Sequence, residues 1–365
     1  MLKRDCLENA VILIYSEEKE MKQIYVFCPY GLTTGGPDAL HQLVYYINKK
    51  KSIAHIVYTD ITKRNKPIPK PYQVYVKDYL LLSDVVDDEE NRIIVPETRS
   101  FYLNNYHKAG LYVWWLSVNN NTSTGFIDKI KKAIEKIFSK SNIKKVFSFY
   151  YTPLRIKEFL KNKAYDFTNE NPAITHLCAS DYALSYVLSK TKNEVHSFVE
   201  PISLFFLKKG ECLGGEREKV ILYNPKKHPK FYKKLLKNKE ELIFKPLIGY
   251  KQEELLSLYR KSVLYIDFGS FPGQERIPKE AVLNGCLILT GKEGASFYHK
   301  DVPIPEEDKI QATNENFDLI YKRIRYLLNN YDKEIVSFSE YRNMVKTTED
   351  KFSESIDEIL FGDKN

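Results

Sequence analysis

The sequence predicts an α/β protein made of two domains that face each other across a cleft. Two stretches far apart in the chain, 23–58 and 263–291, share one pattern. Each has an apolar run of strand length, a loop rich in glycine and proline, a helical segment and a second apolar run. This order is typical of a parallel βαβ unit. At 365 residues the chain is also longer than most single hydrophobic cores, so two domains are expected.

The first unit begins with the strand predicted at 23–29. Pro37 is expected to open the helix that follows, because proline is accepted at a first helical position. The helix has one apolar face, formed by residues spaced three or four apart: Leu40, Leu43, Val44 and Ile47. The loop between strand and helix carries three glycines: Gly31, Gly35 and Gly36.

The second unit carries more chemistry. Pro278 is expected to open its short helix and Gly285 to lie just past the end. Such a loop ends on a helix N-terminus, where free N–H groups and the helix dipole favour an anion. Arg276 and Lys279 add positive charge, and Glu280, expected in the first turn, can accept hydrogen bonds from sugar hydroxyls. The pattern favours a nucleoside diphosphate site over a plain turn with solvated charges.

The rest of the chain alternates between apolar runs and segments of helical periodicity, which favours mainly parallel sheets. Further strands are predicted at 92–95, 111–116, 145–150, 174–180, 220–223 and 242–247. Helices are predicted at 126–138, 154–160, 181–188, 231–238, 252–260, 314–330 and 333–360. The polar stretch 208–219 is expected to link a first domain, 1–207, to a second, 220–340. The terminal helix, 341–365, is expected to return to the first domain.

Composition narrows the class of partner. The formal net charge is +8, but the lysines are scattered and the aromatic residues mostly lie in apolar runs. This argues against nucleic acid and favours a phosphorylated substrate, with contact at an anionic membrane surface. The five cysteines are far apart, so neither a zinc site nor a disulfide framework is indicated. The N-terminus lacks the apolar core of a signal peptide, and a cytoplasmic location is expected.

Four segments resemble the GT-B glycosyltransferases, above all the retaining, nucleotide-sugar-dependent enzymes that build bacterial surface polysaccharides. They are TGGPDALHQL, ITHLCASDYA, VILYNPKK and PKEAVLNGCLILTG. The resemblance implies two Rossmann-like βα domains. The first would take a glycan or lipid-linked acceptor, and the second would bind the nucleotide sugar. It further implies work in the cytoplasm, at the inner face of the membrane.

The resemblance also implies roles for residues. Glu280 matches the second of two family glutamates separated by seven residues, which holds the donor ribose. The first would fall at Pro272 and is absent, so Glu275 is the candidate substitute. Either Lys226 or Lys227 resembles the basic residue that holds the donor diphosphate. Gly35 and Gly36 resemble the glycine loop that faces the transferred sugar.

Other candidates come from position and residue type. Asp38 and His41 follow the first glycine loop and are the catalytic candidates. Gly273 and Arg276 belong to the loop and helix start of the second unit and are expected to bind the donor. Tyr250 follows a predicted strand and can stack on a base. No Asp-x-Asp pair offers itself to a divalent ion, so metal-independent transfer without a cofactor is expected.

Three other functions share parts of this pattern. A nicotinamide-dependent dehydrogenase would need glycines spaced G-x-G-x-x-G, which the first loop lacks. A sugar-nucleotide epimerase of the same architecture would need catalytic acids in place of an acceptor groove. A non-catalytic glycan-binding protein would need stacked aromatic residues on an open face. Glycosyl transfer remains the leading prediction, with the epimerase and the glycan-binding protein as alternatives.

Overall fold

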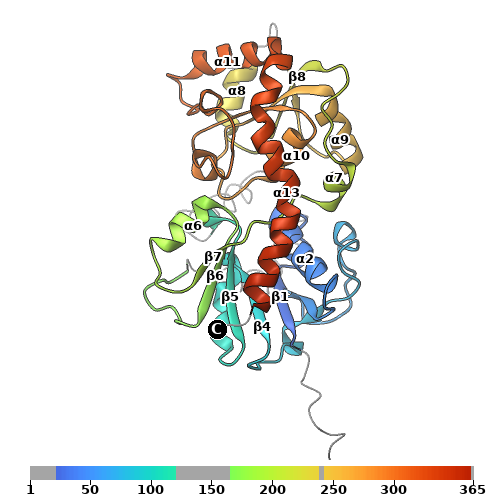
Figure 1. Ribbon diagram of the computed structural model, residues 1–365, viewed down its shortest axis with the longest axis vertical. Coiled ribbons are helices and arrows are strands. Elements are labelled where there is room, and N and C mark those ends of the chain that lie inside the picture. The colour runs from blue at the N-terminus through green and yellow to red at the C-terminus, as the bar shows by residue number, and fades with distance from the viewer. Residues whose placement is uncertain (1–21, 121–164, 238–241, 363–365) are drawn as a thin grey trace, which may run out of the picture.

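The computed structural model of the chain describes residues 22–120, 165–237 and 242–362 (Figure 1). The helices predicted at 126–138 and 154–160 and the strand predicted at 145–150 lie outside the described residues. The described parts form two parallel sheets, one above the other in Figure 1, with a long helix along both. In these parts of the chain, none of the helices combines the length and the apolar character needed to cross a bilayer.

The first sheet has seven strands in the order β3-β2-β1-β4-β5-β6-β7, and every neighbouring pair is parallel. Its central strands are buried on both faces, as expected of a parallel sheet covered by helices. The strands are β1 (Ile24–Cys28), β2 (Ala54–Tyr58), β3 (Leu80–Leu81), β4 (Arg92–Pro96), β5 (Gly110–Trp115), β6 (Ile174–Cys178) and β7 (Val195–Ser197). Within the described residues, the α-helices between these strands are α2 (Gly35–Asn48) and α6 (Asp181–Leu188). Ser180 caps the start of α6, since its hydroxyl accepts the Ala183 N–H, a role for which serine is a preferred residue.

The second sheet has four parallel strands in the order β11-β10-β8-β9. They are β8 (Glu218–Tyr223), β9 (Ile243–Pro246), β10 (Ser262–Asp267) and β11 (Leu287–Thr290). The helices that connect and cover it are α8 (Pro229–Lys237), α9 (Gln252–Lys261), α10 (Arg276–Leu283), α11 (Phe317–Asn329) and α12 (Tyr331–Glu334). A short helix, α7 (Leu204–Lys209), lies between the two sheets in sequence, and the predicted linker 208–219 overlaps its end and the start of β8.

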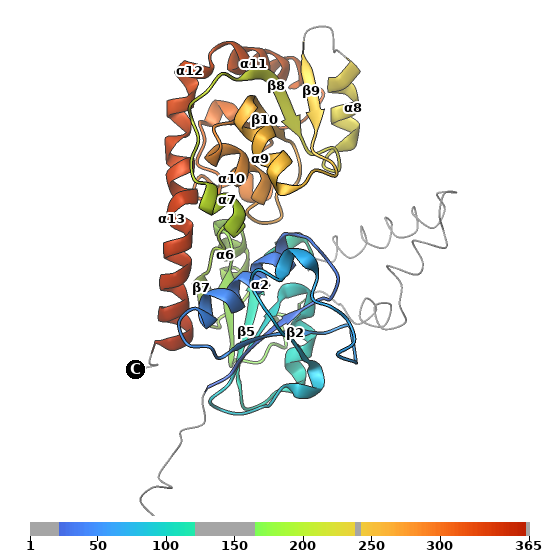
Figure 2. The same ribbon diagram turned by 90° about the vertical axis from the view of Figure 1, so that its right-hand side faces the viewer.

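The long helix α13 (Ser339–Ile356) spans both sheets (Figures 1 and 2). Its first half contributes Tyr341 and Val345 to the core around the second sheet. Its second half contributes Phe352 and Ile356 to a core of the first sheet, where Phe352 stacks on Trp114 with ring centroids 5.9 Å apart. The chain therefore returns to the first sheet at its end. The domain bounds themselves stay a prediction.

The helix starts predicted at Pro37 and Pro278 were both two residues late. Helix α2 begins at Gly35 and α10 at Arg276, so Pro37 and Pro278 each occupy the third helical position. The first four N–H groups of a helix have no partner within it, so proline costs as little at the third position as at the first. Glu280 consequently lies in the second turn of α10. Gly285 lies just past the end of α10, as predicted, and its φ of +84° is the left-handed conformation that favours glycine there.

Candidate functional site

The carboxyl ends of the two sheets meet through the helices that follow β1 and β10. Arg276, the first residue of α10, forms an ion pair with Asp38 of α2, with Nη1 and Oδ2 3.2 Å apart. Gly35, at the start of α2, lies directly against this arginine, since a Cβ there would be 3.3 Å from Arg276 Cδ. The two glycine-loop units predicted from opposite halves of the chain are thus in contact.

Arg276 also holds the glutamate predicted to bind a ribose. Its Nη2 lies 3.5 Å from Glu280 Oε1, and the Tyr259 hydroxyl donates to Glu280 Oε2 at 3.3 Å. Glu280 is only 6% exposed. Burial raises the pKa of Glu280 to about 7, although the charge of Arg276 opposes the rise. A carboxylate with this pKa changes its charge near neutral pH.

Lys227, in the loop between β8 and α8, is held by two carboxylates of the second domain. Its Nζ lies 2.8 Å from Glu275 Oε2 and 3.4 Å from Asp267 Oδ2. Burial alone would lower the pKa of Lys227, but these two charges outweigh it and raise the pKa. Gly269 makes room for the lysine, because a Cβ there would be 2.5 Å from Lys227 Cδ.

The donor loop, 268–275, is fixed on the first domain by backbone contacts. The N–H of Val118 donates to the carbonyl of Pro272 at 2.9 Å. At Gly273 the approach is so close that a Cβ would lie 2.3 Å from the carbonyl oxygen of Leu116. This close approach gives a physical reason for glycine at position 273.

Asp301 fixes the same loop from a second side, and no pattern in the sequence indicates this role. Its carboxylate accepts the N–H groups of Asp181 and Tyr182 at the start of α6, at 2.8 and 2.9 Å. It also accepts a hydrogen bond from Gln274 of the donor loop at 3.0 Å. Asp301 is 1% exposed, so one buried carboxylate ties the N-terminus of a first-domain helix to the donor loop.

Lys279 points into this contact between the domains. It is 1% exposed, and its Nζ donates to the backbone carbonyl of Glu200 at 3.3 Å and to Gln274 Oε1 at 3.4 Å. Burial lowers the pKa of Lys279 and raises that of the Glu200 carboxyl. The Lys279 side chain, predicted to add positive charge beside the donor loop, therefore contributes to the packing between the domains.

His41 lies in the core of the first domain. Its Nδ1 is 2.6 Å from the Pro37 carbonyl and its Nε2 2.9 Å from the Tyr58 hydroxyl. Because a carbonyl only accepts, Nδ1 carries the proton and Nε2 accepts from Tyr58. Its ring stacks on Tyr72, and burial lowers the pKa of His41 to about 4. In this arrangement the neutral ring fixes the first turn of α2, and a catalytic role for it stays a prediction.

The remaining predicted residues differ in exposure. Gly36 lies near Leu116, with 3.8 Å between a built Cβ and Cδ1. Tyr250 is partly exposed in the loop after β9, at the carboxyl edge of the second sheet. Lys226 is exposed beside Lys227, so the two lysines that the sequence could not separate have different surroundings. Lys227 is the one held within the site.

The charges at the centre of the site show what a ligand must displace. Two cations, Lys227 and Arg276, face four carboxylates, those of Asp38, Asp267, Glu275 and Glu280. A diphosphate would take over donors that these carboxylates now occupy. Among the residues that the structure describes, no three His, Cys, Asp or Glu side chains gather as metal ligands would.

No protein-family model and no curated protein matches the chain. Solved structures do. A sucrose-phosphate synthase from Thermosynechococcus elongatus superposes with a TM-score of 0.56 at 10% identity, over 93% of this chain and 98% of that one. The lipopolysaccharide outer core galactosyltransferase WaaB gives 0.54 at 11% identity, over 91% and 99%. A glycosyltransferase from Rickettsia africae ESF-5 gives 0.53 at 12% identity, over 94% and 99%. At such identities the likeness concerns the fold, and it confirms the predicted architecture: the chain has the two-domain GT-B fold.

Proposed function

We propose that the protein is a glycosyltransferase that moves a sugar from a nucleoside-diphosphate sugar to a glycan or lipid-linked acceptor in bacterial surface polysaccharide synthesis. It would act in the cytoplasm, at the inner face of the membrane. The observation that carries the proposal is the contact of Arg276, which follows a strand of the second sheet, with the N-terminal turn of α2 from the first. Lys227 lies beside the same loop, paired with Glu275. Ligands of open α/β sheets bind at the carboxyl ends of the strands.

The second domain would bind the donor. Lys227, Arg276 and the N–H groups at the start of α10 would stabilise the charge that develops on the leaving nucleoside diphosphate. This requires Glu275 to release Lys227 and Asp38 to share Arg276. Glu280 would accept hydrogen bonds from the ribose, and Tyr250 would stack on the base. No residue in this scheme depends on a metal ion.

The first domain would present the acceptor. Gly35 and Gly36 are the first residues of α2, and the transferred sugar would lie at this N-terminus. Asp38 is 7% exposed and bound to Arg276. Asp38 and the diphosphate would share the Arg276 guanidinium, so departure of the diphosphate would change the electrostatic surroundings of Asp38. Donor and acceptor would then meet where the two sheets face each other.

Calorimetric titration with uridine, guanosine and adenosine diphosphates tests the donor site. We expect one of them to bind the parent protein, and Glu280→Gln to weaken that binding by roughly tenfold or more, because charge-assisted acceptors to the ribose are lost. The 2′,3′-dideoxy form of the same nucleotide should bind parent and variant alike. Equal affinity of parent and variant for the ribonucleotide would remove Glu280 from the ribose site.

A second measurement separates transfer from its alternatives. With the preferred nucleotide sugar, a transferase releases nucleoside diphosphate slowly to water and faster with an acceptor glycan. An epimerase would convert the sugar nucleotide without releasing the diphosphate. A glycan-binding protein would bind glycan and leave the sugar nucleotide untouched.

A further inference from the structure

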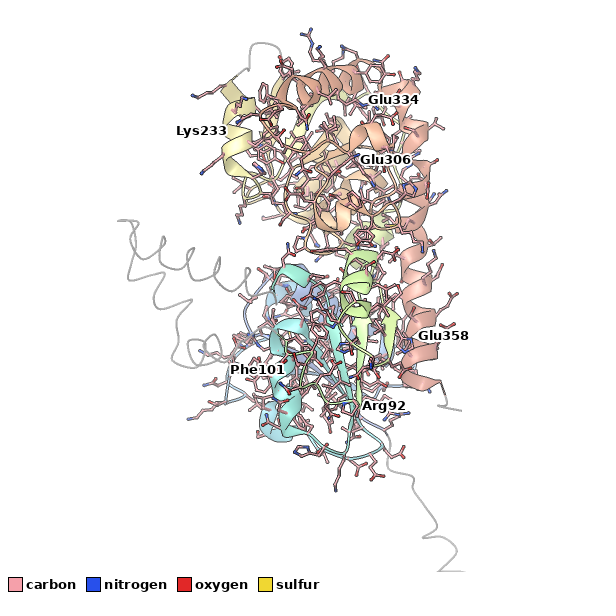
Figure 3. All side chains as sticks on the ribbon, turned by 90° about the vertical axis from the view of Figure 1, so that its left-hand side faces the viewer. Arg92, Phe101, Lys233, Glu306, Glu334 and Glu358 are labelled. Carbon is pink, nitrogen blue, oxygen red and sulfur yellow. The ribbon has the colours of Figure 1, made fainter. Side chains whose placement is uncertain are left out.

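Helix α8 begins two residues after Lys227 and carries a row of lysines on its outer face. Lys230, Lys233 and Lys237 are exposed and fall within an arc of roughly 60° on the helix, along about 10 Å. The opposite face packs into the core of the second domain through Phe231, Tyr232 and Leu235. Figure 3 shows Lys233 projecting from the outer surface of the domain.

Within the described residues, no carboxylate balances the charge of this row. Residues 224–237 contain six lysines and no aspartate or glutamate. In the described parts of the chain, none of the three row lysines has a carboxylate partner, whereas Lys227 has two. Lys234, beside the row, is engaged with Asn314 and lies over the ring of Phe317. The three row lysines therefore offer their charges to solvent.

The shape of the row decides what kind of anion it fits. The three lysines are spread over about 10 Å along one exposed face of a helix, so they are not gathered around a small ligand. Binding of single-stranded nucleic acid without sequence preference uses aromatic side chains that stack on bases, and the aromatic residues of α8 are buried. A broad anionic surface with mobile charges matches the row best, and a bilayer with anionic lipids is such a surface.

The position of α8 relates this row to the rest of the molecule. In Figures 2 and 3, α8 and α13 lie on opposite sides of the second domain. The α13 side carries both signs of charge, including Glu340, Lys351, Glu354 and Glu358 along one groove. An anionic surface is thus expected to attract the α8 side and not the α13 side.

We propose that the α8 lysine row docks the protein electrostatically on an anionic lipid surface, with α13 directed away from it. The inference rests on the proposed function only in its purpose, which is to bring the start of α8, and the candidate site beside it, close to a lipid-linked acceptor. The docking itself needs neither donor nor acceptor. It assigns the membrane contact to the donor-binding domain.

Co-sedimentation with vesicles, without nucleotide or acceptor, tests the proposal. We expect binding to vesicles of phosphatidylcholine mixed with phosphatidylglycerol, no binding to phosphatidylcholine alone, and release by salt. The variant with Lys230, Lys233 and Lys237 changed to Gln should bind roughly a hundredfold more weakly, at about fivefold for each charge. A matched control changes the exposed Lys190, Lys192 and Lys351 to Gln and should bind as the parent does.

Three results would overturn the proposal: equal binding to neutral vesicles, unchanged binding of the α8 variant, or equal loss in the control. Binding of a single-stranded oligonucleotide that is lost in the α8 variant, without vesicle binding, would assign the row to nucleic acid instead. Titration of the α8 variant with nucleoside diphosphate keeps this test apart from the proposed function. Failure of docking leaves that affinity intact, and failure of nucleotide binding leaves vesicle binding intact.

Discussion

The loops before α2 and α10 follow the same local plan, yet the side chains they carry end in different surroundings. Both helices begin with proline at the third position after a glycine loop. In the first unit the polar residues are few, and His41 turns into the core. In the second unit, Glu275, Arg276, Lys279 and Glu280 are all paired, and two of the partners, Asp38 and Glu200, come from outside the second sheet.

The difference shows that a repeated local pattern determines a backbone but not its chemistry. The α2 unit supplies an N-terminus, and its glycines let Arg276 and Leu116 approach it closely. The α10 unit supplies the charged Arg276, which carboxylates neutralise. A bound anion would have to displace these carboxylates. Variants that disturb one unit while sparing the other test this division of roles.

The largest effect is expected from Arg276→Ala. It would leave the carboxylates of Asp38 and Glu280 buried without their cation, so the free energy of unfolding should fall by about 4 kcal/mol. Urea denaturation measures it. The control is Arg64→Ala, which breaks the exposed Arg64–Asp84 pair and should change stability little. If both variants lose the same stability, the buried ion pair between the domains contributes no more than an exposed one.

The pH dependence of stability is the next largest effect. Burial holds the pKa of Glu280 at about 7, above the ordinary 4.5, so between these values the folded protein binds more protons than the unfolded chain. The contribution of Glu280 to the free energy of unfolding is full below pH 4.5 and is lost as the pH rises to about 7. The total change is on the order of 3 kcal/mol.

Glu280→Gln should therefore flatten the curve of unfolding free energy against pH across this window. Buried Asp308, with a pKa raised by burial to about 6, remains in both proteins and cancels in the difference between the two curves. Parallel curves for parent and variant would show that Glu280 does not titrate there.

A smaller effect is expected where the donor loop meets the first domain. Gly273→Ala places a methyl group 2.3 Å from the Leu116 carbonyl oxygen, so the loop must move, at a cost of about 1–3 kcal/mol in unfolding free energy. Diphosphate affinity should fall with it. Gly214→Ala is the control, because a Cβ there meets nothing within 4 Å. Equal stability of both variants would mean that the loop moves away from the Leu116 carbonyl at no cost in free energy.

These cases show how far the sequence could be followed. Strands such as Val263–Ile266 were predictable because buried parallel strands are continuous apolar runs, and Ser180 and Gly285 because helix ends have strong residue preferences. Asp301 was not, because its partners at the start of α6 precede it by 120 and 119 residues and no local pattern links them.

The pairing of charges was equally beyond the sequence. Lys226 and Lys227 are adjacent and identical, and only the folded loop places one against Asp267 and Glu275 and the other in solvent. The type of residue predicted an anion site. Its present occupants, the protein's own carboxylates, depend on tertiary contacts.

The smallest effect is expected from Glu275→Gln, and it is a gain. Glu275 competes with a diphosphate for Lys227, so removing its charge should raise affinity for the nucleoside diphosphate by roughly fivefold in calorimetry. Glu306→Gln, which neutralises the partner of Lys292 on the surface, is the control and should leave affinity unchanged.

The resemblance gives Glu275 another role, as the glutamate that contacts the donor sugar. If Glu275 only competes for Lys227, Glu275→Gln should raise affinity for the diphosphate and for the sugar nucleotide alike. If Glu275 contacts the sugar, the same change should lower affinity for the sugar nucleotide alone, and that outcome would place Glu275 in the donor site itself.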